Sequence, residues 1–379
     1  MPLTNRCALV SVLRGGIILM MCCCGTRVPA ADWPIFRGNP ALTGVAASTL
    51  PAKPALLWSF KTSGPVRSSA VIGGGKVFIG SNDGQVHALD FASGHELWAF
   101  KADSAVQAPP LLANNSIFVG SVEGIFYAIN AADGHQLWKY ATEGKILASA
   151  NAVSSGDGPP HILVGSYDFK LYCLNATNGA VIWSYETGNY INGSCAVAGG
   201  QAIFGGCDAL VHVLDVATGT KIKEIDAGAY IAASASLAGN HAYFGHYDNE
   251  FLSVDLGEGK VVWRYRDLDF PYMAAAAVTD DRVVFGGHDK ALHCVDRAAG
   301  KSLWKFPTGG KVESAPVVAG DKVVFGSDDG IVYMVSLADG KQLWSYEIGQ
   351  AVASSPAVSD EKIVIGSDDG GVYCFGQKG

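Results

Sequence analysis

One position of mixed side-chain type recurs along the sequence and is the best candidate for a binding site. It lies 13 residues before a glycine that returns every 40 to 45 residues. The residues at this position are Arg67, Gln107, Asn192, Ala232, Met273, Glu313 and Ala353, and Leu147 takes the place in the one repeat with an insertion. A position that serves only the fold keeps one residue type. We therefore predict that Arg67, Gln107, Asn192 and Glu313 contact a ligand or partner.

Tyrosines strengthen one part of this candidate site. Tyr190 and Tyr230 occupy one position in successive repeats, and Tyr272 falls one residue later in the next repeat. Aromatic rings beside the amide of Asn192 suit a peptide strand or a small ring compound. The alternative is that these rings only fill space at the centre of the fold.

The residues that most often catalyse reactions or bind metals share structural positions here. His87, His212 and His293 lie seven residues after the recurring glycine, where other repeats place a tyrosine. Cys173, Cys294 and Cys374 share another position with alanines of sister repeats, which is typical of small buried residues. His246 and His288 fall in neighbouring loops, but two histidines alone are weak evidence for a metal. We predict no catalytic residue and no metal site.

The repeat itself is defined by three columns of residues. The glycines are Gly80, Gly120, Gly165, Gly205, Gly245, Gly286, Gly326 and Gly366, and an Asp or Glu follows each by three positions. The tryptophans are Trp58, Trp98, Trp138, Trp183, Trp263, Trp304 and Trp344, with Lys223 in the remaining place. We expect the tryptophans to pack between neighbouring repeats and the acids to cap tight turns.

Each repeat reads as four short strands separated by Gly and Asp turns, which is typical of a propeller blade. The fold class is therefore all-β, an eight-bladed β-propeller of four-stranded antiparallel blades. The chain begins with a lone fourth strand around Trp58 and ends with three strands over 352–376. Because an open sheet edge is a liability, we predict that the N-terminal strand completes the last blade. Arg67 and Glu313 would then face one central channel, within reach of an ion pair across it.

The first 30 residues differ from the rest. Arg6 and Arg14 precede a short apolar stretch over 17–21, and Ala30 supplies a small residue for cleavage, as in a secretory signal peptide. Lipid attachment at Cys22, Cys23 or Cys24 is disfavoured because Met21 or a cysteine precedes each. We predict a signal peptide over 1–30, an extended segment over 31–50 and the propeller over 51–379, in a periplasmic or extracellular location.

Charge and composition exclude several partners. The formal net charge of −8 becomes −11 without residues 1–30, which carry three arginines and no acid. An acidic body argues against nucleic acid and against anionic membrane surfaces. No apolar run after residue 30 is long enough to span a membrane. We expect a monomer that binds a protein or a small molecule at the channel face.

Segments 352–358, 365–373 and 339–344 resemble the repeats of the pyrroloquinoline-quinone (PQQ) propeller family, and 32–38 (Asp-Trp-Pro-Ile-Phe-Arg-Gly) is similar to the start of its secreted members. The resemblance implies one of two branches. Quinoprotein dehydrogenases bind PQQ and calcium over the channel, often under a disulfide of adjacent cysteines. BamB-type propellers are eight-bladed scaffolds that help to assemble outer-membrane β-barrels without a cofactor.

The sequence favours the second branch, because after residue 30 it has no adjacent cysteines and no recognisable calcium-binding set. We predict an exported, non-catalytic binding or scaffold protein without a cofactor. The alternative is a PQQ-dependent oxidoreductase with calcium. A third reading is a carbohydrate- or peptide-binding accessory module that depends on Tyr190, Tyr230 and Tyr272.

Overall fold

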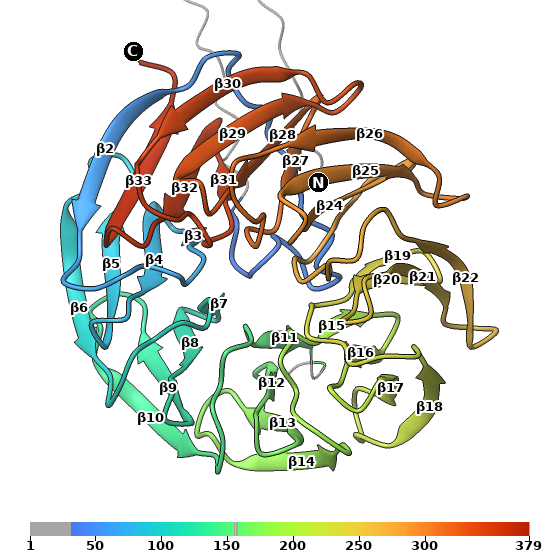
Figure 1. The fold of residues 1–379 in the computed structure, drawn as a ribbon. Coiled ribbons are helices and arrows are strands. Elements are labelled where there is room, and N and C mark those ends of the chain that lie inside the picture. Colours follow the sequence, from blue (N-terminus) through green and yellow to red (C-terminus); the bar gives the residue numbers. More distant parts are fainter. Residues whose placement is uncertain (1–31, 155, 157, 379) are drawn as a thin grey trace, which may run out of the picture. The chain divides into compact units, whose positions relative to one another are not determined.

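The computed structural model describes residues 32–154, 156 and 158–378, which form a ring of eight sheets (Figure 1). Blade 1 contains β3 (Val71–Gly73), β4 (Lys76–Gly80), β5 (Gln85–Asp90) and β6 (Glu96–Lys101). Blade 2 contains β7 (Leu111–Ala113), β8 (Ser116–Gly120), β9 (Ile125–Asn130) and β10 (Gln136–Ala141). Blade 3 contains β11 (Asn151–Val153), β12 (His161–Gly165), β13 (Lys170–Asn175) and β14 (Val181–Glu186). Blade 4 contains β15 (Ala196–Ala198), β16 (Gln201–Gly205), β17 (Leu210–Asp215) and β18 (Lys221–Asp226).

The second half of the ring repeats this plan. Blade 5 contains β19 (Ser236–Ala238), β20 (His241–Gly245), β21 (Phe251–Asp255) and β22 (Lys260–Tyr265). Blade 6 contains β23 (Ala277–Val278), β24 (Arg282–Gly287), β25 (Ala291–Asp296) and β26 (Ser302–Pro307). Blade 7 contains β27 (Val317–Ala319), β28 (Lys322–Gly326), β29 (Ile331–Ser336) and β30 (Gln342–Glu347). Blade 8 contains β31 (Ala357–Ser359), β32 (Lys362–Gly366), β33 (Gly371–Gly376) and β2 (Ala55–Lys61). The first strand of each blade is innermost.

The predicted eight-bladed, all-β fold and its mode of closure are confirmed. Strand β2 pairs antiparallel with β33, with Trp58 opposite Cys374 and Phe60 opposite Val372. In Figure 1 the two strands lie side by side. The predicted signal peptide and Cys22, Cys23 and Cys24 lie outside the described residues. No helix among the described residues is long and apolar enough to cross a membrane.

The tryptophan column links neighbouring blades, as predicted. Trp58 Nε1 donates a hydrogen bond to the Phe91 carbonyl of blade 1 at 3.1 Å, and its ring packs against Gly94 of the same blade. A Cβ on Gly94 would lie 2.5 Å from the indole, so only glycine leaves room for the ring. Trp138, Trp263 and Trp304 donate to the next blade in the same way, at 2.9 Å. These four bonds join blade 8 to blade 1, blade 2 to blade 3, blade 5 to blade 6 and blade 6 to blade 7, each through a buried ring.

Lys223 reproduces this link without an aromatic ring. Its Nζ donates to the Leu256 carbonyl at 3.0 Å, and its aliphatic chain lies against Gly259, the glycine that would face an indole. We therefore expect Lys223→Trp to be neutral or stabilising by up to about 1 kcal/mol, since the receiving pocket already exists. Thermal unfolding of the variant tests this. A loss of more than about 2 kcal/mol would show that this seam differs from the others.

The acid column caps turns, also as predicted. Asp329 accepts hydrogen bonds from the Ile331 amide at 3.1 Å and from the Gly309 amide at 2.8 Å. Its carboxylate further accepts the hydroxyl of Tyr333, and His212 makes the equivalent contact with Asp208 at 3.0 Å. Tyr172, Tyr373 and His293 make the same contact, so most histidines and tyrosines of this shared position tie the third strand to the turn before it.

The segment before β2 crosses one end of the ring. Main-chain amides of blades 1, 2, 4, 5, 6 and 7 donate hydrogen bonds of 2.7–2.9 Å to carbonyls of this segment. In the same order, the accepting carbonyls are those of Trp33, Pro34, Pro40, Ala41, Thr43 and Gly44. Asn151 of blade 3 donates its side-chain amide to Pro40 at 2.8 Å. Strand β1 (Val45–Ala46) then pairs parallel with β27. The segment lies at the end of the inner strands opposite to Arg67 and its equivalents.

Arg37 anchors this segment. Its side chain is 1% exposed, and its guanidinium donates to the carbonyls of Ala276, Ala315 and Pro316 at 2.8, 3.0 and 2.6 Å. Burial lowers the pKa of Arg37 to about 9, so the carbonyl dipoles have to stabilise a charge that water does not reach. A Cβ on Gly44 would lie 1.8 Å from the guanidinium, which explains the glycine there.

Candidate functional site

The channel position identified in the sequence forms one cavity. Its lining consists of Arg67, Gln107, Leu147, Asn192, Ala232, Met273, His288, Glu313 and Ala353, around a volume of about 350 Å³. All eight blades contribute one residue from the segment that leads into the innermost strand, and His288 is the one addition. We call this space the channel cavity. It brings Arg67, Gln107, Asn192 and Glu313 together, and whether they bind a ligand stays a prediction.

The charged residues of the channel cavity are paired locally. Arg67 makes a bidentate contact with Asp368, with Nε and Nη2 at 3.0 and 2.7 Å from the two carboxylate oxygens. Glu313 Oε1 lies 3.1 Å from His288 Nε2. The imidazole of His288 beside it lowers the pKa of Glu313. The prediction of an ion pair between Arg67 and Glu313 across the channel is wrong, because each residue has a partner in an adjacent loop.

A second ring of residues at the channel mouth escaped the sequence analysis. It lies two residues after each column glycine and consists of Asn82, Val122, Tyr167, Cys207, Tyr247, His288, Asp328 and Asp368. The main-chain amides of Cys207 and Tyr247 donate to the loop that leads into the innermost strand of their own blade, Cys207 to the Tyr190 carbonyl at 3.0 Å and Tyr247 to the Tyr230 carbonyl at 3.1 Å. The residue types in this ring are as mixed as those at the position of Arg67, so the argument that identified that position would also have identified this ring.

Aromatic side chains collect on one side of this mouth. Tyr167 stacks on Tyr190 with ring centroids 4.9 Å apart, and Phe169 lies 5.2 Å from Tyr190. Tyr230 and Tyr247 line an adjoining groove of about 380 Å³ and are 57% and 51% exposed. We call these five residues the aromatic mouth. Large exposed rings gathered in one place are typical of binding surfaces, whereas scattered ones are not.

Asn192 connects the aromatic mouth to the channel cavity. Its side-chain oxygen accepts the hydroxyl of Tyr167 at 2.6 Å, and its amide nitrogen donates to the Ala232 carbonyl at 3.2 Å. The ring of Tyr167 is thus fixed at the boundary between the two features. Gln107 lines the channel cavity from the segment that leads into β7 of blade 2.

Tyr272 does not belong to the mouth, and its predicted place there is wrong. Its side chain is 1% exposed and packs edge-on against Phe285 and His293. It occupies the core position held by Ile191 and Ile231 in the preceding blades, where the side chain covers the column glycine of the blade before. A shift of one residue along an extended segment turns a side chain to the other face.

The opposite side of the mouth is acidic. Asp328 lies near Glu313 and Asp368, and burial together with these two carboxylates raises its pKa. A carboxyl whose pKa is raised on folding weakens the fold as the pH rises through the range where it ionises. Asp328→Asn is therefore expected to raise the melting temperature at pH 7, with the gain vanishing below about pH 4, where the unfolded carboxyl is also protonated. Thermal melts across pH test this, and a destabilised variant at pH 7 would contradict it.

Among the described residues, one group of three potential metal ligands lies within 4.8 Å: Asp267, Asp289 and His293. It does not line the channel cavity. Lys305 donates hydrogen bonds to both carboxylates, with Nζ 2.7 Å from Asp289 Oδ2, so an ammonium group already neutralises the acids. The burial of His293 and Asp289 makes this a structural cluster.

Comparison with known proteins identifies the family. The family model described as outer membrane protein assembly factor BamB matches residues 44–265 and 254–378. The chain belongs to this family of PQQ-like β-propellers. No curated protein matches the chain. Membership of the BamB family fixes the architecture of the channel but not its ligand.

Solved structures share the fold at low identity. BamB from Moraxella catarrhalis is 17% identical with a TM-score of 0.70, over 86% of this chain and all of that one. The quinohemoprotein alcohol dehydrogenase from Comamonas testosteroni is 14% identical with a TM-score of 0.78, over 92% of this chain and 81% of that one. A europium-containing methanol dehydrogenase is 13% identical with a TM-score of 0.74, over 92% and 98%. The fold of this chain is therefore shared by BamB and by two alcohol dehydrogenases.

The channel cavity does not fit PQQ and calcium. Calcium needs six to eight oxygen ligands at 2.3–2.6 Å, whereas the described carboxylates of the channel do not converge on one point. Arg67, the cation best placed to bind an anionic cofactor, is engaged by Asp368. The described cysteines, Cys173, Cys195, Cys207, Cys294 and Cys374, are all free thiols, so none forms the disulfide under which many quinoproteins hold their cofactor.

Titration of the purified protein with PQQ and calcium should consequently leave its melting temperature unchanged. A ligand at 100 times its Kd would stabilise the fold by about 2.7 kcal/mol, which a thermal melt detects easily. Cofactor absorbance provides a second readout. A concentration-dependent rise in melting temperature that Glu313→Gln abolishes would restore the dehydrogenase alternative.

Proposed function

We propose that this protein is an exported, non-catalytic propeller that binds a segment of a partner protein at the aromatic mouth. The observation that supports this most strongly is the clustering of five aromatic side chains at the end of the channel that the N-terminal segment leaves free. Aromatic residues are enriched in protein–protein interfaces because they bury large areas at low entropic cost.

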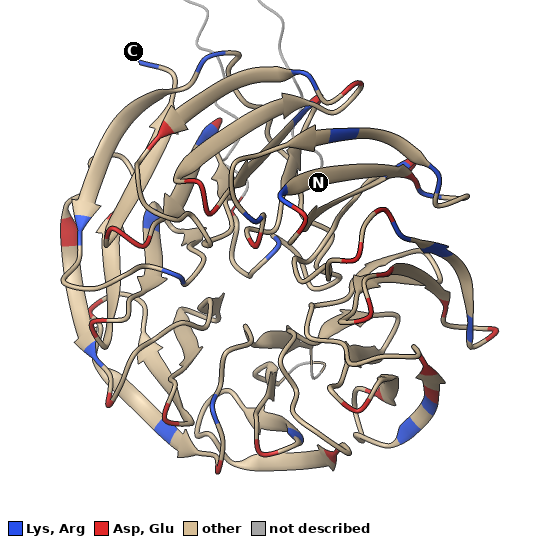
Figure 2. Ribbon diagram, viewed as in Figure 1, with Lys and Arg blue, Asp and Glu red and all other residues tan. Residues whose placement is uncertain are grey.

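Two further observations support a protein partner. The family model that matches this chain is described as an outer membrane protein assembly factor, BamB, and BamB from Moraxella catarrhalis shares the fold. Lys and Arg are interspersed with Asp and Glu around the ring (Figure 2), unlike the continuous basic stripe that nucleic acid requires. The signal-peptide pattern of residues 1–30 supports a periplasmic or extracellular location, without a lipid anchor at Cys22, Cys23 or Cys24. We propose that the protein acts as a monomer.

The acidic side of the mouth would set the orientation of the partner. Asp328 and Glu313 face the aromatic side across the channel cavity, so an extended segment with apolar side chains at one end and a Lys or Arg at the other would match both. Gln107 and Asn192 would bond to its main chain. A small-molecule ligand in the channel cavity alone would need the polar residues and not the rings.

An array of 15-residue peptides tests the proposal. We expect the wild-type protein to select peptides with aromatic or aliphatic residues, and the double variant Tyr230→Ser, Tyr247→Ser to lose at least tenfold in affinity for them. The matched control is Leu97→Ser, Leu343→Ser, which removes two exposed apolar residues from the outer strands of blades 1 and 7. Equal selection by both double variants would refute a role for the mouth.

A further inference from the structure

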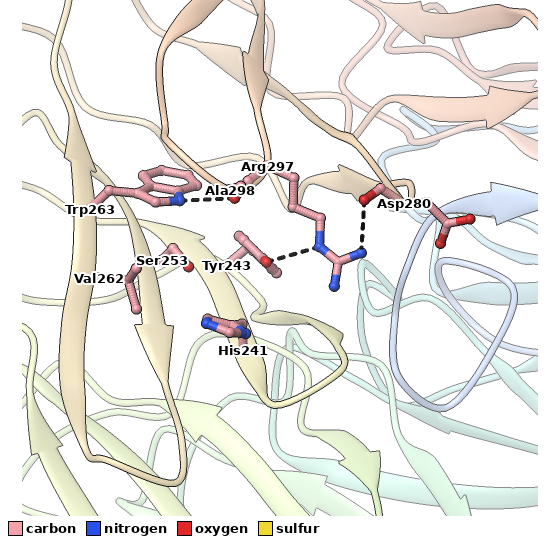
Figure 3. A pocket seen from close by; sticks show the side chains of 8 residues that line it. All are labelled: His241, Tyr243, Ser253, Val262, Trp263, Asp280, Arg297 and Ala298. Carbon is pink, nitrogen blue, oxygen red and sulfur yellow. Dashed lines mark hydrogen bonds between the residues drawn. The ribbon is translucent and has the colours of Figure 1, made fainter.

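A second cavity lies between blades 5 and 6 and shares no lining residue with the channel cavity. It has a volume of about 290 Å³ and is lined by Tyr243, Ser253, Trp263, His241, Arg297 and Asp280, among others. Figure 3 shows the guanidinium of Arg297 between the Tyr243 hydroxyl and the main chain of Asp280, with the Asp280 carboxylate pointing away. Nothing in the proposed function uses this cavity.

The other blades show that this lining departs from the repeat. Where blade 5 has Ser253, the sister positions hold Ala88, Ala128, Cys173, Val213, Cys294, Met334 and Cys374. Where it has Tyr243, they hold Phe78, Phe118, Leu163, Ile203, Val284, Val324 and Val364. Where blade 6 has Arg297, six of the seven sisters are Phe91, Ala131, Ala176, Val216, Leu256 and Leu337. Three apolar positions have become polar, and all three meet at one seam.

Ser253 is the sharpest of these departures. Its side chain is 1% exposed, and its Oγ has no hydrogen-bond partner in the structure although it faces the cavity. A buried hydroxyl without a partner destabilises the fold, and sister blades avoid this cost with an apolar residue. An unpaired hydroxyl on the wall of a cavity therefore points to a polar ligand atom.

The neighbouring groups offer donors rather than acceptors. Arg297 Nε donates to the Tyr243 hydroxyl at 3.0 Å, which leaves the phenolic proton free for another acceptor. The other guanidinium contacts are the carbonyls of Ala238, Thr279 and Asp280, at 3.2–3.3 Å, so one of its five N–H groups is unused. Within the described part of the chain, no carboxylate lies within 4.0 Å of this guanidinium. Its positive charge lacks a counterion.

Aromatic rings form the remaining walls. Tyr243 lies 6.0 Å from Trp263 and 6.2 Å from His241 between ring centroids. Trp263 is held in place because its Nε1 donates to the Arg297 carbonyl at 2.9 Å. Flat apolar walls beside a cationic donor group suit a ligand with a planar body and one anionic end.

We propose that the cavity between blades 5 and 6 binds a small carboxylate with a planar, apolar body. The carboxylate accepts hydrogen bonds from Ser253 Oγ, the Tyr243 hydroxyl and the free N–H of Arg297, and the body lies against the rings of Tyr243 and Trp263. The site is independent of the aromatic mouth, so a protein partner and this ligand bind separately.

Titration calorimetry with benzoate tests the site, with benzamide as the neutral isostere. We expect benzoate to bind at millimolar concentration or tighter and benzamide at least tenfold more weakly. Arg297→Leu, which introduces the residue found at position 337, should reduce benzoate affinity at least tenfold. Ser253→Ala should reduce it about threefold to tenfold while leaving the melting temperature unchanged or higher, because it removes an unpaired hydroxyl.

Arg282→Leu is the matched control. Arg282 likewise donates to main-chain carbonyls of an adjacent blade, those of Leu337 and Ala338 in blade 7, but does not line the cavity. Its loss should not alter benzoate binding. Three results would each overturn the proposal. The first is equal affinity for benzoate and benzamide, and the second is no benzoate binding at about 10 millimolar, roughly ten times the weakest Kd that we expect. The third is unchanged benzoate affinity in folded Ser253→Ala and Arg297→Leu.

Discussion

Deleting residues 51–62 is expected to leave a chain that cannot close its ring and is recovered as insoluble protein. The deletion removes β2, so β33 loses its antiparallel partner and presents an open edge. It also removes Trp58, whose buried ring and Nε1 bond to Phe91 join blade 8 to blade 1. Both the last blade and the seam beside it are therefore lost. The yield of soluble protein and its thermal unfolding measure the effect.

Point variants in the same strand provide a graded version of this test. Trp58→Ala should destabilise the fold by about 3–5 kcal/mol, the usual cost of removing a large buried ring. Ser59→Ala is the control, since Ser59 is exposed on the same strand and should cost less than about 0.5 kcal/mol. A soluble deletion variant that melts at the wild-type temperature would show that the ring closes without β2.

Replacing Arg37 is expected to release the N-terminal segment from the ring. Arg37→Met leaves the carbonyls of Ala276, Ala315 and Pro316 without their donor in a buried place. Each unpaired carbonyl costs about 1–3 kcal/mol, partly offset because the buried guanidinium itself carries a desolvation cost. We expect a net loss of about 2–4 kcal/mol in the free energy of unfolding. Hydrogen exchange should increase first at the amides that bond to the segment, such as Val278 and Val318.

Arg266→Met is the control for this prediction. Arg266 is half-exposed and, within the part of the chain that the structure describes, pairs with Asp269 on the surface, so its loss should leave the melting temperature close to that of the wild type. If both arginine variants had the same small effect, the N-terminal segment would not depend on its buried anchor.

The blades were predictable because each position in the repeat has the same neighbours eight times. The Trp and Gly columns occupy complementary places at six seams, and at a seventh Lys223 keeps the hydrogen bond of the ring that it replaces. The inner position was predictable for the same reason. Regular columns mark packing, and the irregular column led to the channel cavity.

The remaining features depend on contacts that do not recur from blade to blade. The course of residues 32–46 is set by amides from seven blades, and its sequence has no periodicity from which those partners follow. Arg67 was expected to pair with Glu313 across the channel. Instead, Arg67 pairs with Asp368 and Glu313 lies beside His288, and both partners stand in turns that follow the second strand of a blade. Tyr272 differs from Tyr190 by one register position, which is enough to move a ring from the mouth into the core.

Site-specific photo-crosslinking in the native host tests the central claim most directly. A photoreactive phenylalanine analogue placed at position 230 or 247 should give a discrete adduct with one partner protein, because both positions lie in the aromatic mouth and are about half exposed. The same analogue at position 97, equally exposed on an outer strand, should give none. Adducts from position 97 alone, or from none of the mouth positions, would contradict a partner at the aromatic mouth.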